Sequence, residues 1–346
     1  MYFHLFKASI YGKFWRIRSV WHTVLMPLSW LYYLAYLIRY HVLSFPKKIE
    51  KPVICVGNIT VGGAGKTEVA LALGRLCLKL RLRPVFIAHG YNSAIRGDKE
   101  FIVVNSKLHT SADVGDEAIL LAQLAPTYIS KNRVVAARAA AKEADILIFD
   151  DGMQNNKLKK DLVFSVINSD YLFGNQLLLP VGPLREPIMG SIARSDYFIF
   201  TYCDGVLDQS RKELQALFTS NKPIMYLNTE ILNAEQIKDR SFVAICGIAN
   251  PANFLKTLHS LNITVVEHFI FSDHHQYTEQ ELESVCLVAT KCDVKIITTA
   301  KDIARIPQKY HAFIEVVRLY SKFHATKELS KTIICISRHF ILHLVN

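Results

Sequence analysis

The segment of residues 53–67 constrains this chain more than any other. Val53–Val56 form an apolar run typical of a buried strand, and a glycine-rich stretch follows that ends in Gly65-Lys66-Thr67. An apolar repeat of helical period begins directly afterwards, from residue 69 to residue 80. A strand, a glycine turn, Lys-Thr and a helix in this order are typical of a P-loop, whose backbone N–H groups bind phosphate oxygens. An ordinary glycine turn between a strand and a helix is the alternative, but it does not explain the Lys-Thr pair.

The turn predicts a binding site for a nucleoside triphosphate with Mg²⁺. Lys66 would reach the β- and γ-phosphates, the Thr67 hydroxyl would hold Mg²⁺, and the helix N-terminus would favour the negative charge. The common pattern has glycine at position 60 where this chain has Thr60, so Gly62 and Gly63 would supply the flexibility. The expected nucleotide contacts are Thr60, Val61, Gly62, Gly63, Ala64, Gly65, Lys66 and Thr67.

Apolar runs alternate with helical patterns from residue 53 onward. Repeated strand–helix units with continuously apolar strands predict a mostly parallel sheet covered on both faces. We therefore expect an α/β fold of the P-loop NTPase type, a smaller second α/β lobe and an N-terminal membrane-associated helix. The first lobe's expected strands are 53–56, 85–88, 101–104, 133–135, 146–149, 162–167 and 197–201, and its helices begin at residues 116 and 136.

A second unit of the same kind follows a polar stretch. Residues 222–239 mix proline, asparagine and charge, which predicts a linker between two lobes. We expect three domains: 1–50 as a membrane-anchoring segment, 51–225 as the P-loop core and 226–346 as the smaller lobe. The expected strands of that lobe are 242–247, 264–266 and 295–299, and its helices are 252–260 and 279–289.

Two carboxylates follow the predicted strand 146–149. Asp150 and Asp151 stand where a parallel sheet opens toward its ligand, and one of them can bind Mg²⁺ directly or through water. An Asp-Gly turn that merely ends the strand is the alternative. Because a P-loop lies upstream, we prefer the metal site and leave open which carboxylate is nearer the ion.

Other polar residues also gather at expected strand and helix ends. Asp116 opens a helix after a glycine, where it would either cap the helix or accept a proton from an attacking hydroxyl. His274 lies in a loop of the second lobe, where it would bind metal, orient a base or be exposed. The proline loop 179–187 is rigid, and its Arg185 suits phosphate binding unless the loop is only a structural corner. His89-Gly90-Tyr91 and Thr299-Ala300-Lys301-Asp302 follow strands and are expected at the same crevice.

The net charge of +11 is concentrated near the start of the chain. Residues 1–49 contain no Asp or Glu but carry Lys7, Lys13, Arg16, Arg18, Arg39, Lys47 and Lys48. The rest is only mildly basic, which argues against a nucleic-acid-binding surface, and no obligate protein partner is indicated. Residues 19–38 are free of formal charge and rich in aromatic residues, so we favour an interfacial anchor that binds anionic headgroups. A true span and a core helix are the alternatives. The span is weakened by Pro27 in the middle of the stretch and by basic residues at both of its ends.

The seven cysteines are scattered and form no Cys-x-x-Cys pair. This spacing suggests neither a zinc site nor a redox motif, and it favours buried thiols in a reducing compartment. With the basic aromatic N-terminus, it predicts a protein at the cytoplasmic face of a membrane.

Taken together, these motifs resemble the tetraacyldisaccharide 4′-kinase family of lipid A biosynthesis. The matching pieces occur in family order across nearly the whole chain, and the Thr60 departure is typical of the family. They are 57–67, 114–117, 150–154, 179–187, 272–274 and 299–302.

The resemblance implies phosphorylation by ATP and Mg²⁺ of the 4′-hydroxyl of a tetraacylated disaccharide 1-phosphate, giving lipid IVA, at the cytoplasmic face of the bacterial inner membrane. It assigns Asp116, His274 and Lys66 to catalysis, with Asp116 as the base. It assigns Arg185 to the nucleotide, and Thr67, Asp150, Asp151 and Glu186 to the metal.

The sequence departs from the family at two places. The family has Ser-Arg-Gly-Tyr-Gly where residues 88–92 are Ala-His-Gly-Tyr-Asn, and a histidine where this chain has Asn155. Two rival classes are a membrane-associated partner-positioning ATPase and a GTPase switch. Val61 replaces the signature lysine of the first, and the guanine-reading Asn-Lys-x-Asp of the second is absent from the sequence.

Overall fold

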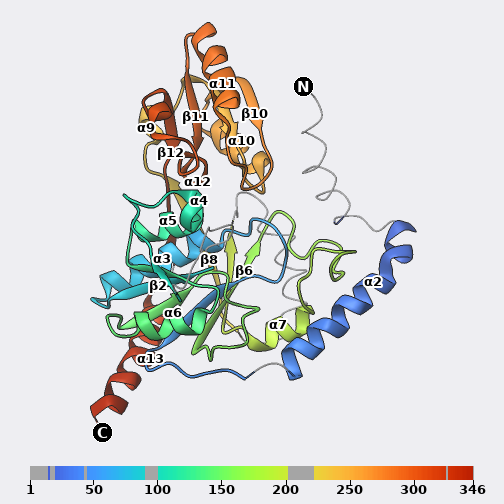
Figure 1. Cartoon of the computed structure of the whole chain (residues 1–346), viewed down its shortest axis with the longest axis vertical. Helices are drawn as coiled ribbons and strands as arrows, with labels where there is room; N and C mark the ends of the chain where they lie inside the picture. Colours follow the sequence, from blue (N-terminus) through green and yellow to red (C-terminus); the bar gives the residue numbers. More distant parts are fainter. Residues whose placement is uncertain are drawn as a thin grey trace.

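The computed structural model describes residues 15, 20–42, 45–89, 100–201, 222–324 and 326–345. Within them the chain forms two α/β lobes, a large one built on a nine-stranded sheet and a small one built on a four-stranded sheet. Figure 1 shows the small lobe at the top, the helix α2 along one side of the large lobe, and the C-terminal helix α13 at the opposite lower side.

The large sheet has the strand order β13-β8-β7-β6-β1-β5-β2-β4-β3. Its inner strands are parallel, whereas β3 and β13 pair antiparallel at the two edges. The P-loop strand β1 is central because it pairs with β5 on one side and β6 on the other. The strands are β1 (Val53–Gly57), β2 (Pro84–Ala88), β3 (Ile102–Val103), β4 (Thr127–Ile129), β5 (Ile146–Phe149), β6 (Leu162–Asn168), β7 (Tyr197–Thr201), β8 (Ile224–Ile231) and β13 (Leu319–Phe323).

Helices cover both faces of this sheet, as the unalternating apolar strands predict. Successive residues of β1 point to opposite sides, so Ile54 packs with one helical layer and Val53 with the other. The first layer holds α3 (Lys66–Lys79), α5 (Asp116–Ala122) and α13 (Lys327–Val345). The second holds α6 (Arg133–Ala140) and α7 (Ile188–Arg194).

The small lobe repeats the same principle at smaller scale. Its sheet is wholly parallel in the order β10-β9-β11-β12. Apolar clusters lie on both of its faces, so it has a core of its own. Its elements are β9 (Ser241–Cys246), α10 (Pro251–Ser260), β10 (Thr264–Ile270), α11 (Glu279–Lys291), β11 (Lys295–Thr299), α12 (Ala300–Ile303), the 3₁₀ helix η2 (Gln308–Phe313) and β12 (Ile314–Val317).

One expectation from the sequence was wrong. Residues 133–135 begin α6 rather than form a strand, because Asn132 caps the helix by accepting a hydrogen bond from the Val134 N–H. Residues 222–239, the expected connection between the lobes, hold β8, which pairs with β7, and the short helix α9 (Ala234–Ile237).

The chain passes between the lobes twice, once after β8 and once before β13, and these two strands pair with each other. β8 leads out of the large sheet and β13 returns to it, so the expected boundary at residues 225 and 226 falls inside β8. The C-terminal helix α13 then packs against the large core through Leu329 and Ile333. The amide of Asn233 joins the crossings, donating to the Val316 oxygen at 2.9 Å and accepting from the Arg318 N–H at 3.1 Å.

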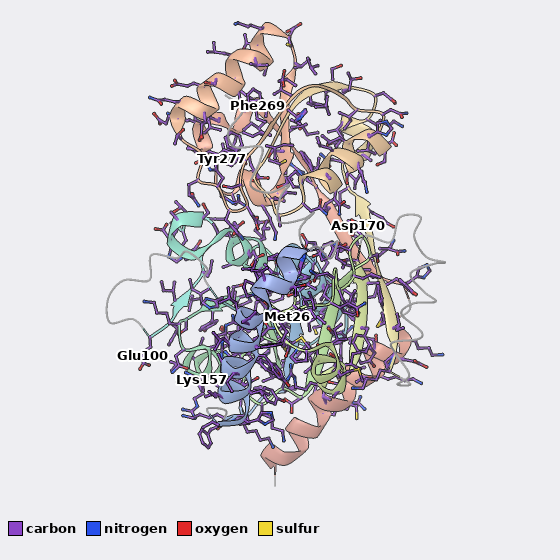
Figure 2. The ribbon with its side chains drawn as sticks, turned by 90° about the vertical axis from the view of Figure 1, so that its right-hand side faces the viewer. Met26, Glu100, Lys157, Asp170, Phe269 and Tyr277 are labelled. Atoms are coloured by element: carbon purple, nitrogen blue, oxygen red, sulfur yellow. The ribbon has the colours of Figure 1, made fainter. Side chains whose placement is uncertain are left out.

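The helix α2 (Val20–Leu37) continues through Pro27 into a π-helical turn, η1 (Ile38–Val42). It lies against the large lobe, and Figure 2 shows it crossing the front of that lobe with Met26 near its middle. None of the described helices is both long enough and apolar enough to cross a membrane. Four of the basic residues of the expected membrane anchor, Lys7, Lys13, Arg16 and Arg18, lie outside the described residues.

Candidate active site

The P-loop connects the end of β1 to the start of α3. Gly62 and Gly65 have φ angles of 114° and 81°, a left-handed region that other residues adopt only with strain. Two side chains at the ends of β6 and β7 hold the loop from outside: Asn168 Nδ2 donates to the Gly63 oxygen at 3.2 Å, and Thr201 Oγ1 to the Ala64 oxygen at 2.9 Å. The predicted loop therefore has the expected backbone form and is fixed by its neighbouring strands.

The two chemically important side chains of the loop face the carboxylates at the end of β5. Lys66 Nζ lies 3.3 Å from Asn58 Oδ1 and 3.7 Å from Asp151 Oδ1. Thr67 Oγ1 donates to Asp150 Oδ2 at 3.1 Å. The strand order places β5 next to β1, which is why two motifs about eighty residues apart in sequence meet here.

Asp150 has the surroundings of a metal ligand. Its Oδ1 atom is buried and makes no hydrogen bond, which is unusual for a carboxylate oxygen. Burial, with the nearby charge of Glu117, raises the pKa of Asp150 to about 7. Mg²⁺ would satisfy this oxygen. The described residues hold no cluster of three or more His, Cys, Asp or Glu that could bind a metal ion by themselves.

Asp151 plays a different part from its neighbour in this structure. Its carboxylate is 3.1 Å from Arg185 Nη1, and its backbone has a φ of 50°. Burial alone would raise its pKa, but the charges of Lys66, Arg185 and Arg133 outweigh burial and lower it. Arg133, buried at the start of α6, donates to the peptide oxygens of Asp150 and Asp151 at 3.3 and 2.8 Å and so supports the turn that carries both carboxylates.

The predicted Asp–His pair forms between the lobes. Asp116 begins α5 in the large lobe, and His274 Nδ1 of the small lobe lies 3.3 Å from its Oδ1. The other carboxylate oxygen, Oδ2, accepts from Arg305 at 2.7 and 3.2 Å. Burial would raise the pKa of Asp116, but the hydrogen bond from His274 and the charge of Arg305 hold it below its ordinary value. The same hydrogen bond raises the pKa of His274.

A second ion pair crosses between the lobes beside the first. Lys301 Nζ lies 2.9 Å from Glu117 Oε1, and the charge of Lys301 lowers the pKa of Glu117. At a third place, Asn253 Nδ2 of α10 donates to Asp170 Oδ2 of the large lobe at 2.8 Å. Figure 2 shows Asp170 at the junction, below the lobe that carries Phe269 and Tyr277.

The proline loop supports the P-loop from the side. The Val61 N–H donates to the Pro183 oxygen at 2.8 Å, and the Arg185 N–H donates to the Ile59 oxygen at 2.7 Å. Through its side chain, Arg185 pairs with Asp151, so it lies next to the expected triphosphate position. The loop is therefore part of the site rather than a remote structural corner.

Glu186, also expected to bind the metal, is buried in the proline loop. Its carboxylate is bound by Arg194, by Gln154 Nε2 at 3.1 Å and by the Tyr36 hydroxyl at 3.4 Å. Both oxygens therefore have protein partners in this structure, and the metal role of Glu186 stays a prediction. In this structure Glu186 anchors α2 and α7 to the loop that carries Arg185.

The two residues that depart from the family pattern, Asn155 and His89, lie in different surroundings. Asn155 forms a local turn in which its side chain accepts from the Lys157 N–H at 3.0 Å. His89 is exposed at the end of β2, while residues 90–92 lie outside the described part of the chain.

Sequence reasoning missed Arg133 and Arg305 as members of the site. Arg133 was included in an expected strand, and Arg305 belongs to none of the motifs. The sequence offered one hint for Arg305, its place four residues after Lys301, and in the structure it lies in the turn that follows α12. Their acidic partners are adjacent at the start of α5, a relationship that only the contact between the lobes reveals.

A loop with the geometry of a triphosphate site thus faces a carboxylate–histidine pair contributed by both lobes, and this combination defines a phosphotransferase of the P-loop class. The chain belongs to the tetraacyldisaccharide-1-P 4′-kinase family (LpxK), whose profile matches residues 21–336.

Relatives that carry this name and a solved structure agree with this assignment. The tetraacyldisaccharide 4′-kinases of Rhodopseudomonas palustris BisB5 and Paramagnetospirillum magneticum are 37% and 35% identical, over 74% and 88% of this chain and 75% and 91% of their own lengths. The crystal structure of LpxK from Aquifex aeolicus in complex with ATP is 26% identical, with a TM-score of 0.71, and covers 92% of this chain and 99% of its own. The predicted α/β fold and kinase class are confirmed.

Proposed function

We propose that this protein transfers the γ-phosphoryl group of ATP to the 4′-hydroxyl of a tetraacylated disaccharide 1-phosphate. The observation that carries the proposal is the Asp116–His274 pair, which joins the lobes at 3.3 Å. The next residue, Glu117, is close enough to the P-loop Lys66 to interact with its charge. A nucleotide-binding loop alone fits many P-loop proteins. A carboxylate base placed next to it supports transfer to an alcohol.

Charge neutralisation would come mainly from the P-loop side. Phosphoryl transfer requires positioning and electrostatic stabilisation more than covalent chemistry. Lys66 would move from Asn58 and Asp151 onto the β- and γ-phosphates, and Arg185 lies beside it. Thr67 and Asp150 would hold Mg²⁺, and the ion would neutralise part of the phosphate charge.

The acceptor hydroxyl would approach from the junction of the lobes. Asp116 would accept its proton, while His274 would hold the carboxylate in orientation and share the resulting charge. The low pKa of Asp116 keeps the carboxylate ionised, so it is ready to accept a hydrogen bond from the hydroxyl. Because the pair is divided between the lobes, the complete site requires them to be in contact.

The N-terminal helix supports action at a membrane surface. The face of α2 that touches the protein holds His22 and Ser29, both buried. The opposite face exposes large apolar side chains, which fits insertion into the boundary between headgroups and acyl chains. These are Val24, Leu28, Trp30, Leu31, Leu34 and Ile38, each at least 46% exposed.

This arrangement, with the basic residues around the helix, supports peripheral attachment at the cytoplasmic face of the inner membrane. An acylated acceptor would remain in the bilayer while its sugar enters the site. We therefore infer that the membrane surface is the partner of α2.

The proposal is tested by incubating the purified protein with labelled ATP, Mg²⁺ and a disaccharide lipid acceptor, and then separating the lipids. Label is expected in the lipid fraction, on the 4′ position of the distal sugar. Release of inorganic phosphate with unlabelled lipid would instead support the ATPase alternative. GTP in place of ATP tests the switch alternative, and it should give little product.

A further inference from the structure

We propose that Arg305 is a positioning residue for the phosphoryl transfer: it fixes the carboxylate of Asp116 so that one oxygen, Oδ1, remains for His274 and the acceptor hydroxyl. The Arg305 side chain is buried, so we expect it to contact neither reactant directly. The inference rests on the proposed role of Asp116 as the base. It concerns a residue outside every motif that the sequence singles out.

The first support is the geometry of the ion pair. Arg305 Nη2 and Nε donate to the same oxygen, Asp116 Oδ2, at 2.7 and 3.2 Å. His274 meets the other oxygen, Oδ1, at 3.3 Å. A guanidinium that holds one oxygen with two donors restricts rotation of the carboxylate, which a single lysine donor does less well. The orientation of the other oxygen of Asp116, Oδ1, is thereby fixed.

The second support is that one backbone group, the Gly247 oxygen, binds both Arg305 and His274. The Gly247 oxygen accepts from Arg305 Nη1 at 2.8 Å and from the His274 N–H at 3.1 Å. His274 has a φ of 58°, so its backbone is held in a left-handed conformation at this contact. Both partners of Asp116 therefore move together with the end of β9.

The third support is the burial of the arrangement. The Arg305 side chain is 1% exposed, and the Asp116 side chain 8%. Asp302 holds Arg305 from behind at 3.3 Å, and its carboxylate also accepts from the Gly247 N–H and the Tyr277 hydroxyl. Burying and immobilising this ion pair costs free energy, because both side chains lose water and conformational freedom. Such a cost is expected where the orientation of a reacting oxygen matters.

A double-mutant cycle separates positioning from general support of the fold. Arg305→Ala should lower kcat by about 100-fold, because a misplaced base loses its alignment with the hydroxyl. The Kd for ATP–Mg²⁺ should stay within about 2-fold, since the P-loop is untouched. In an Asp116→Ala background the same substitution should change kcat by less than about 3-fold, because Arg305 acts only through that carboxylate.

A conservative variant and a control variant complete the experiment. Arg305→Lys keeps the charge but cannot donate twice to one oxygen, so we expect a kcat reduced by about 10-fold and again no further effect beside Asp116→Ala. If Arg305→Ala does not fold, the double-mutant cycle of Arg305→Lys with Asp116→Ala tests the positioning role in its place. Arg240→Ala removes a small-lobe arginine that contacts the Gln236 oxygen, and it should leave kcat unchanged.

The outcomes that would overturn the inference are distinct. Equal losses of kcat with and without Asp116 would make Arg305 a structural residue while leaving the base assignment intact. Unchanged kcat in Arg305→Ala and Arg305→Lys would remove any role. Near-normal kcat in Asp116→Ala alone would refute the base, and the positioning role would fall with it.

Discussion

The hydroxyl of Tyr32 donates a hydrogen bond of 2.8 Å to the peptide oxygen of Arg185. One residue belongs to the N-terminal helix and the other to the loop beside the P-loop. Ser29, one turn earlier in α2, donates to the Leu178 oxygen of the same loop at 2.9 Å. The helix with the exposed apolar face is therefore attached directly to the segment that supports the nucleotide site.

Removal of the P-loop side chains should abolish turnover without unfolding the protein. Lys66→Ala and Thr67→Ala are each expected to lower kcat by at least about 100-fold, because each removes a group that stabilises phosphoryl charge. Thr67→Ser keeps the hydroxyl and should retain most activity. Labelled lipid product and thermal unfolding are the measurements, and near-normal turnover in the alanine variants would contradict the P-loop assignment.

Asp116→Ala should affect the chemical step far more than nucleotide binding. The carboxylate is expected to contribute about 100-fold to 10,000-fold as a general base, while ATP contacts remain. Separate determination of kcat and of the ATP Kd tests this. A comparable loss in both quantities would identify Asp116 as a binding residue instead.

Asp150→Asn should stabilise the metal-free protein while it inactivates the enzyme. The folded-state pKa of about 7 exceeds the ordinary 3.8, so folding favours the protonated form. The stability that this group contributes is full below about pH 3.8 and falls as the pH rises through about 7. Above pH 7 a buried, incompletely bonded charge remains, and asparagine removes it.

We expect the variant's gain in the free energy of unfolding to increase between pH 5 and 7 and to reach about 1–2 kcal/mol at pH 8 in EDTA. Asp145→Asn is the matched control. Its carboxylate pairs with Arg83 and has a lowered pKa, so neutralising it should not stabilise the fold. A flat difference for Asp150→Asn across this range would show that its charge is not penalised by burial.

His274→Gln should weaken the fold mainly at low pH. The hydrogen bond with Asp116 raises the pKa of His274 above 6.5 in the folded state. Its contribution is therefore complete below about pH 6.5 and declines as the pH rises through the raised value. Melting temperatures of the variant and the wild type should converge as the pH rises, whereas His259→Gln, at an exposed site in α10, should show no such trend.

The exposed face of α2 should bind liposomes. Trp30→Glu with Leu34→Glu places two charges on this face and is expected to weaken binding to anionic vesicles by at least about 10-fold, because burial of a large apolar side chain is worth about 1.5–3 kcal/mol. Leu287→Glu, at an exposed position of α11, is the control and should bind normally. Deletion of residues 1–40 should have a similar effect, and unchanged sedimentation with vesicles would refute the membrane role of this helix.

The local sequence determined the individual motifs. The strand before Gly57, the turn that ends at Gly65 and the helix from Lys66 follow from side-chain periodicity and from the conformational freedom of glycine, which depend on neighbouring residues alone. The same is true of β5 and its two carboxylates. The meeting of these two motifs was predictable because parallel strands present their carboxyl ends at one edge of a sheet.

The return of the chain to the large sheet was decided by tertiary structure. The segment 222–239 mixes proline, asparagine and charge and was therefore interpreted as a linker, although pairing with β7 and β13 makes residues 224–231 a strand. A strand such as β8 gains much of its stability from partners distant in sequence, and no local pattern records those partners. The extent of each lobe could not be derived from periodicity for that reason.

The environment of the charged side chains was also decided by the tertiary structure. The sequence located Asp116 and Glu186 as candidate site residues but could not say which side chains surround them. Their roles depend on partners in other elements, Arg305 in one case and Arg194 in the other, and on burial that strengthens these interactions. Electrostatic interaction depends on distance in space and on solvent exclusion, so only the folded chain assigns each carboxylate its partner.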